Sequence, residues 1–238
     1  MPLDPLLLSR MIAAHQLWLA DPTKGMRAVF DGLNLDGANL NGVNLSGASF
    51  KNVSMQNASA IGANFQNAVM SNINVRGASM HQTNLAGADM SSMTADGARF
   101  DDSTMHGAKL NNASMPNASL KRAGMIGANA SGADMTGAAM ADVRAHGANF
   151  NSVKLDGATM DRAAFHNSDM TGASARNSSA QSTRFDNAKL AGMSFAGSDV
   201  RQASFQNANA PGAFFKTAQT SGANFTGAVG HSLTGIRS

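Results

Sequence analysis

An apolar residue recurs at every fifth position over most of this 238-residue chain. The series runs from Phe30 to Phe225 without an insertion and contains 40 positions, here called centres, of which all but Thr220 are apolar. In residues 35–50 (LDGANLNGVNLSGASF), a small apolar residue such as Ala38 stands two places before a centre, and Gly or Asn stands two places after it. An α-helix repeats every 3.6 residues and a strand every two, so neither element can bury a five-residue pattern. The chain must therefore turn at a regular interval.

Each five-residue unit predicts a minimal strand followed by a corner. The alternation of apolar, polar and apolar residues is typical of a strand, and Gly or Asn adopts the positive φ that a tight turn needs at low cost. Repeated corners of one hand wind the chain into a coil, and four units per turn give about 20 residues per coil and about ten coils, spaced about 4.8 Å apart. Residues 20 apart would lie above one another in successive coils and form a column. Such columns support this count, since one is nearly all Ala and two others are more varied. Because the corners before the varied columns often lack Gly and Asn, we expect a different turn type there.

The recurring frame, A-[ND]-[LMF]-x-[GN], resembles that of the pentapeptide repeat family and covers about residues 28–227. The resemblance implies an all-β solenoid, a right-handed quadrilateral β-helix with an N-terminal α-helical cap. It says little about function, because the repeated residues are structural. The stretch from Trp18 to Ala28 is also similar to the lead-in of bacterial family members of unknown role.

Three parts are predicted along the chain: an N-terminal helix and lead-in at 1–26, the β-helix at 27–229 and a C-terminal tail at 230–238. Asp4 is placed to cap the helix and Pro5 suits its first position. A solenoid has an open end that needs covering, and the helix offers an apolar stripe for that purpose, made of Leu7, Met11 and Trp18 with Leu8, Ile12, His15 and Leu19 beside it. A surface for a partner or for a membrane interface is the alternative reading of this helix.

Composition excludes several classes of protein. The chain has no Cys, which rules out disulfides and thiolate metal sites, and its formal net charge is only +3. It has no basic segment leading into a long apolar run and no stretch of about 20 apolar residues. We therefore expect a cytoplasmic protein without a membrane partner, although unconventional secretion would leave no trace in the sequence.

No motif of an enzyme is present. There is no G-x-S-x-G elbow, no GxxxxGK[ST] loop and no GxGxxG opening a helix, and the many glycines fit the corners. The 16 Met residues fit a core in which flexible side chains fill gaps. His146 and His166 lie in one column and could share a metal, but exposed histidines without a metal are the preferred interpretation. We predict neither catalysis nor a cofactor.

Two surfaces are candidates for binding. The first is a charged edge where signs alternate from coil to coil, which could be a solvated structural edge or a docking surface for a protein; its residues are Asp102, Arg122, Asp142, Arg144, Arg162 and Arg184. The second is the C-terminal end, which has no predicted cap and could pair two chains into a homodimer; its residues are Phe205, Phe214, Phe215 and Phe225.

The predicted function is that of a rigid scaffold or interaction module. The family resemblance offers one alternative, because some members imitate duplex DNA and bind DNA gyrase. Duplex DNA carries one negative charge per about 1.7 Å, so a mimic about 48 Å long needs roughly 28 of them. Residues 27–225 contain 13 Asp against 15 Lys or Arg, which disfavours that role. Direct nucleic-acid binding and ice binding are disfavoured too, since the basic excess is small and the outward columns are mixed.

Overall fold

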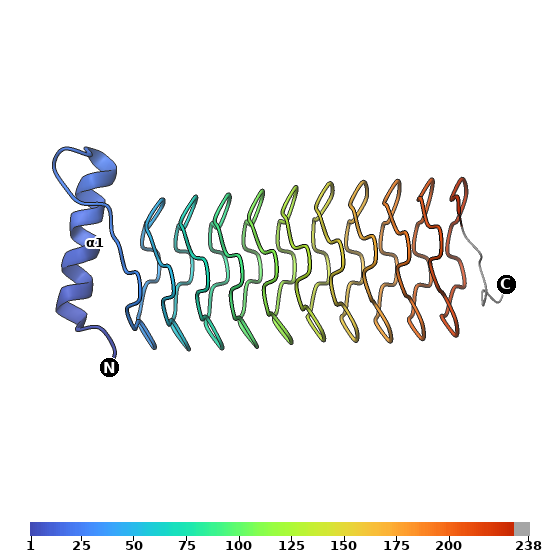
Figure 1. Cartoon of the computed structure of the whole chain (residues 1–238), viewed down its shortest axis with the longest axis horizontal. Helices are drawn as coiled ribbons and strands as arrows, with labels where there is room; N and C mark the ends of the chain where they lie inside the picture. Colours follow the sequence, from blue (N-terminus) through green and yellow to red (C-terminus); the bar gives the residue numbers. More distant parts are fainter. Residues whose placement is uncertain (231–238) are drawn as a thin grey trace.

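The computed structural model describes residues 1–230, and these form one helix followed by a long β-helix. The helix, α1 (Pro5–Ala20), stands across one end of a column of stacked coils, and the described chain ends at the opposite end of the column (Figure 1). Of the predicted C-terminal tail, only Gly230 lies within the described residues.

The coils are joined by parallel bridges rather than by long strands. Every fifth residue from Val29 to Asn209 forms a bridge with the residue 20 places further along the chain. Around one bridge, Phe30 N–H donates to Ser49 O at 2.8 Å and Ser49 N–H donates to Ala28 O at 3.0 Å. The chain therefore returns to the same position every 20 residues, with four bridge residues in each return.

All corners share one backbone conformation. Every fifth residue from Gly32 to Gly227 has a φ between +52° and +73°, whether it is Gly, Asn or a charged residue. A hydrogen bond such as Leu33 N–Phe30 O (2.9 Å) closes the turn, in the arrangement of a type II turn. The expectation of a different turn type before the varied columns is wrong: Arg162, with a φ of +59°, turns the chain as a glycine does.

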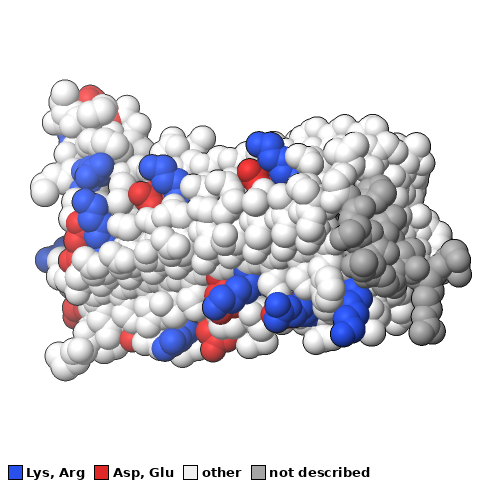
Figure 2. Space-filling view, turned by 45° about the vertical axis from the view of Figure 1, so that its right-hand side comes forward, with Lys and Arg blue, Asp and Glu red and all other residues white. Residues whose placement is uncertain are grey.

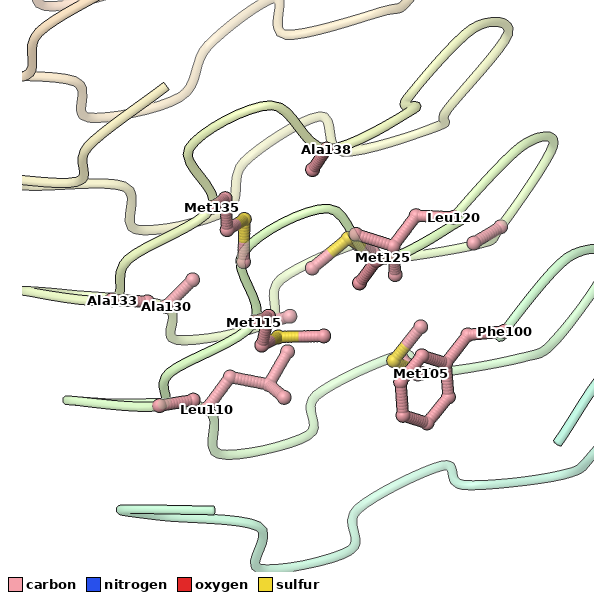
Figure 3. Packing of buried hydrophobic residues seen from close by; sticks show 14 of the residues in the cluster. Phe100, Met105, Leu110, Met115, Leu120, Met125, Ala130, Ala133, Met135 and Ala138 are labelled. Carbon is pink, nitrogen blue, oxygen red and sulfur yellow. The ribbon is translucent and has the colours of Figure 1, made fainter. Parts of the chain in front are cut away.

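The interior is a stack of the predicted centres. Phe165, Phe185 and Phe205 lie over one another with ring centroids 5.8 and 5.0 Å apart, and Phe225 continues the stack. Aromatic pairs in such offset stacks stabilise a core beyond the burial of their area. The Met side chains fill the remaining space as expected: Figure 3 shows Met105, Met115, Met125 and Met135 directed into the column, and all four are fully buried.

Aspartates connect neighbouring coils outside this core. Asp31 Oδ1 accepts hydrogen bonds from Ser49 Oγ at 2.6 Å and from Lys51 N–H at 2.9 Å, both in the next coil. The same pairing of an Asp with a Ser 18 residues later recurs at Asp36–Ser54, Asp101–Ser119, Asp156–Ser174, Asp161–Ser179 and Asp186–Ser204. These six carboxylates are therefore structural.

Helix α1 covers the first coil and is anchored by its backbone and by its side chains. As predicted, Asp4 caps it by accepting from Leu6 and Leu7 N–H, and Pro5 occupies its first turn. Leu3 N–H donates to Asn34 O at 2.7 Å and Gln16 Nε2 donates to Asn44 O at 2.6 Å, so two carbonyl groups at the open end of the β-helix are satisfied.

The orientation of α1 differs from the predicted stripe at one residue. Leu8 and His15 are buried, and Met11 and Ile12 pack against the core, but Leu7 is 47% exposed and faces away from the coils. Gly25 allows this close packing, because a Cβ there would lie 2.3 Å from Ala14 O in α1. Within the described part of the chain, α1 is too short and not apolar enough to cross a membrane.

Candidate functional site

The predicted charged edge is formed mainly by corner residues. Asp102, Arg122, Asp142 and Arg162 occupy the same corner in four successive coils, each with a φ between +58° and +60°. Arg122 Nε and Nη2 donate to Asp102 Oδ1 and Oδ2, both at 2.7 Å. Arg162 binds Asp142 in the same two-pronged manner, with both distances 2.8 Å. The planar guanidinium matches a carboxylate in this geometry, so each pair holds its side chains in a defined direction.

These pairs shift the protonation equilibria of their members. The hydrogen bond from Arg122 holds the pKa of Asp102 below its usual value, and the bond from Arg162 does the same to the pKa of Asp142. The pKa values of both arginines are raised in turn. All four groups therefore stay charged near neutral pH, and each pair is close to neutral as a unit.

The alternating ladder predicted from the sequence is divided into two separate pairs. Within residues 1–230 no ion pair joins Arg122 to Asp142, although they too are one coil apart. Each arginine reaches back to the aspartate 20 residues before it. The edge thus carries two separate, neutral Arg–Asp pairs, here called clamps, rather than a continuous chain of charges.

Arg144 and Arg184 extend the edge on the adjacent side of the coils. They occupy bridge positions two coils apart, with the small residue Ala164 between them in the same column. Arg184 Nε lies 3.3 Å from Asp186 Oδ2. Among the described residues, the exposed side chain of Arg144 has no ion-pair or hydrogen-bond partner, so its charge is uncompensated.

The histidine column next to the edge forms a stack. The rings of His146 and His166 lie 4.9 Å apart and nearly parallel, as their shared column predicted. Burial, followed by the charge of Arg184 and by His146, lowers the pKa of His166. In residues 1–230, no group of three or more His, Cys, Asp or Glu side chains is placed to hold a metal ion.

The second predicted surface, at the C-terminal end, is only partly accessible. Phe205 and Phe215 are each 1% exposed and belong to the interior stack, so their assignment to an outer surface is wrong. Phe225 is partly buried against Phe205 and Phe215, while Phe214 is 40% exposed and points outward. The centres of the last coil face the interior for the same reason as all other centres, and the tail residues 231–238 lie outside the described part of the chain.

Sequence reasoning missed the pairing of Asp with Ser between coils. A signal was present, because each Asp one place after a centre is followed by a Ser 18 residues later, as in Asp101–Ser119. The pairing uses carboxylates that would otherwise form an acidic surface. On the face seen in Figure 2, blue and red groups lie close to one another in two rows along the axis, and an uncharged band separates the rows except at the left-hand end.

Comparison with known families agrees with this geometry. The family model described as "Pentapeptide repeats" matches in 8 copies, at residues 28–67, 63–107, 98–137, 146–179 and 183–218. Together these segments cover well over half of the chain. No curated protein sequence is significantly similar to it.

Several solved structures are similar to the chain. A trypsin-treated variant of QnrB1, described as a plasmid-mediated fluoroquinolone resistance protein, is 16% identical with a TM-score of 0.58, over 78% of this chain and 90% of that one. Full-length QnrB1 is 16% identical with a TM-score of 0.50, over 82% and 89%. HetL of the cyanobacterium Nostoc, a protein involved in heterocyst differentiation regulation, is 22% identical over 89% and 94%, with a TM-score of 0.33. At these identities the QnrB1 similarity concerns the fold alone, a right-handed β-helix.

Proposed function

The chain belongs to the pentapeptide repeat family, and we propose that it is a non-enzymatic interaction module that docks a protein partner along its charged edge. The edge consists of Asp102, Arg122, Asp142, Arg144, Arg162 and Arg184. The observation that carries the proposal is the pair of two-pronged Arg–Asp clamps next to Arg144, whose side chain has no partner among the described residues. Such an edge presents ordered charges at a fixed spacing, which favours specific recognition over general attraction.

The rigidity of the rod supports the same proposal. We take the cross-section to be four-sided with about ten coils, because one bridge falls at every fifth residue and each spans 20 residues. Each repeat in such a solenoid contacts only its neighbours and presents its outward side chains on a regular surface. A partner that matches both clamps, whose equivalent residues lie two coils apart, would therefore be held in one register.

Binding to DNA gyrase is the alternative, and its support is the fold shared with QnrB1. The charge distribution works against it. Residues 27–225 contain more Lys and Arg than Asp, and at least six of the Asp side chains are engaged between coils. A DNA mimic needs free carboxylates in rows. A supercoiling assay with purified gyrase is expected to show no inhibition by this protein.

The docking proposal is tested by quantitative affinity capture from the native extract with purified protein. Wild type is compared with Arg144→Glu/Arg184→Glu and with a matched control, Arg76→Glu/Arg176→Glu, which makes the same charge change elsewhere on the coils, where both side chains are exposed. We expect the wild type and the control to capture one partner that the edge variant does not capture. When that partner is purified, we expect it to bind the wild type and the control with similar affinity and the edge variant more weakly. Equal capture by all three proteins would contradict the proposal.

A further inference from the structure

The backbone of the first coil has an open edge beside α1. Ala28 O and Phe30 N–H both bond to Ser49 in the second coil, so the N–H and C=O of Val29 itself point the opposite way, toward the N-terminal end. Neither group has a hydrogen-bond partner among residues 1–230. By contrast, the carbonyl groups of Asn34 and Asn44 in the same coil are satisfied by Leu3 and by Gln16. Helix α1 thus caps part of this edge and leaves the backbone groups of Val29 free, as it does those of Asn39 in the same coil.

An apolar cavity of about 310 Å³ adjoins this free edge. Helix α1 contributes Met11 and Ala14 to its wall, the lead-in contributes Met26, and the first coil contributes Ala28 and Val29. Met26 is 73% exposed and Val29 is 48% exposed, although most Met and Val side chains of the β-helix are fully buried. The cavity is large enough for one or two aliphatic side chains, and exposed apolar residues beside it are typical of a binding surface.

Two arginines flank the cavity without compensation. Arg10 of α1 and Arg27 of the lead-in both line it and are exposed, and no ion pair or hydrogen bond of either side chain occurs in the described part of the chain. No carboxylate lines the cavity. Nine Lys and Arg side chains in residues 1–230 form ion pairs, as Arg122 does with Asp102, and Arg10 and Arg27 are not among them. Two free guanidinium groups at one site favour a ligand that carries negative charge.

We propose that this N-terminal flank binds an extended, acidic segment of a partner protein. The segment places an aliphatic side chain in the cavity, pairs its backbone with the N–H and C=O of Val29, and directs flanking carboxylates to Arg10 and Arg27. Addition of a strand to an open edge obtains affinity from main-chain hydrogen bonds and specificity from side-chain pockets. The three features are complementary to one kind of ligand, because only a polypeptide supplies backbone donors and acceptors at the spacing that Val29 requires. This surface is separate from the charged edge proposed above.

The probe for the test is a fluorescein-labelled heptapeptide, Asp-Asp-Val-Leu-Val-Asp-Asp, titrated with the full chain and followed by fluorescence anisotropy. The matched peptides carry Lys in place of every Asp, or a methyl group on the central backbone nitrogens. We expect saturable binding of the acidic peptide, a loss of at least tenfold for each matched peptide, and a shift of the Val29 amide signal in an NMR titration. Absence of binding, or equal binding of the Lys peptide, would overturn the proposal.

Protein variants locate the site. Arg10→Glu/Arg27→Glu is expected to weaken binding of the acidic peptide at least tenfold, because both substituted side chains are exposed and support no internal contact. Arg76→Glu/Arg176→Glu and Arg144→Glu/Arg184→Glu are expected to leave it unchanged, which separates this site from the charged edge. Binding that survives Arg10→Glu/Arg27→Glu would contradict the proposal. Binding of the wild-type protein to phosphatidylserine vesicles but not to the peptide would also contradict the proposal, since that result would assign the flank to a membrane surface.

Discussion

Arg122 and Asp102 lie one coil apart, share two hydrogen bonds of 2.7 Å, and both occupy corners with positive φ, +59° and +58°. Gly or Asn adopts this conformation at lower cost than Arg does. The backbone therefore does not explain the choice of residue at these corners, whereas the pairing of charges between coils does. The same holds for Arg162 and Asp142.

The first prediction concerns the strength of this pair. Arg122 is exposed, so replacing it by Gln is expected to lower the urea midpoint of unfolding slightly in dilute buffer and not at all in about 1 M salt, where exposed charges are screened. Arg76→Gln is the control, since no ion pair of Arg76 occurs among residues 1–230. A loss that persists at high salt would show that Arg122 stabilises the coil by packing instead.

The second prediction tests the corner conformation. Gly107 has a φ of +64°, and a Cβ added there would meet no atom within 4 Å, so a substitution probes the backbone without a steric clash. Gly107→Ala is expected to cost about 1–2 kcal/mol in the free energy of unfolding. Gly107→Asn is expected to cost less, because Asn67 and Asn167 turn the same corner in other coils at positive φ. If urea unfolding showed equal losses of stability for the Ala and Asn variants, the positive φ assigned to this corner would be contradicted.

The third prediction concerns pH and the helical cap. His15 is fully buried, its Nδ1 accepts a hydrogen bond from Ala28 N–H at 3.1 Å, and burial lowers the pKa of its imidazole below the usual value of 6.5. The unfolded chain then binds a proton more readily than the folded one. The stabilising contribution is complete above pH 6.5 and is lost as pH falls from there toward the lower pKa of the folded state.

Trp18 reports on this event, because it is the only Trp and its ring stacks on His15 at 5.3 Å. In acid we expect its fluorescence to change and α1 to loosen before the coils unfold. His15→Asn keeps an oxygen that can accept the Ala28 bond but does not titrate, and should flatten the pH response of Trp18. If the fluorescence of Trp18 still changed with pH in that variant, the change would have to come from a titrating group other than His15.

The fourth prediction addresses the core. Phe185 lies in the interior stack between Phe165 and Phe205, and Phe185→Ala is expected to cost about 3–5 kcal/mol in the free energy of unfolding. Met115→Leu, a change of similar volume at another buried centre, is expected to cost less than about 1.5 kcal/mol. The free energies of unfolding are measured by calorimetry or in urea. Equal losses of stability in the two variants would contradict the account.

The regular parts of the molecule could be predicted from the sequence because each depends on spacing alone. A five-residue period places Phe165, Phe185 and Phe205 over one another, and the structure confirms their stack. The conformation at Arg162 could not be predicted in this way, since residue preference argues against a positive φ that the neighbouring coils impose.

The rotation of α1 about its axis also could not be predicted from the sequence pattern. Leu6, Leu7 and Leu8 are adjacent and equally apolar, so periodicity cannot decide which of them faces the coils. Contacts distant in sequence, such as Gln16 with Asn44, accompany the burial of Leu8 and leave Leu7 exposed. The free edge at Val29 depends on the same rotation, and for that reason it could be recognised only in three dimensions.

The stacking of coils every 20 residues is the claim on which the remaining account depends, and engineered disulfides test it directly. The chain has no Cys, so introduced pairs are free of background. Thr94 and Ser114 form a bridge between neighbouring coils, a placement compatible with a disulfide. Under mild oxidation, Thr94→Cys/Ser114→Cys is predicted to cross-link rapidly, whereas Thr94→Cys/Lys109→Cys and Thr94→Cys/Ser119→Cys, each displaced by one corner, are predicted to remain reduced. Equal cross-linking of the three pairs, or preference for a displaced pair, would contradict the 20-residue coil.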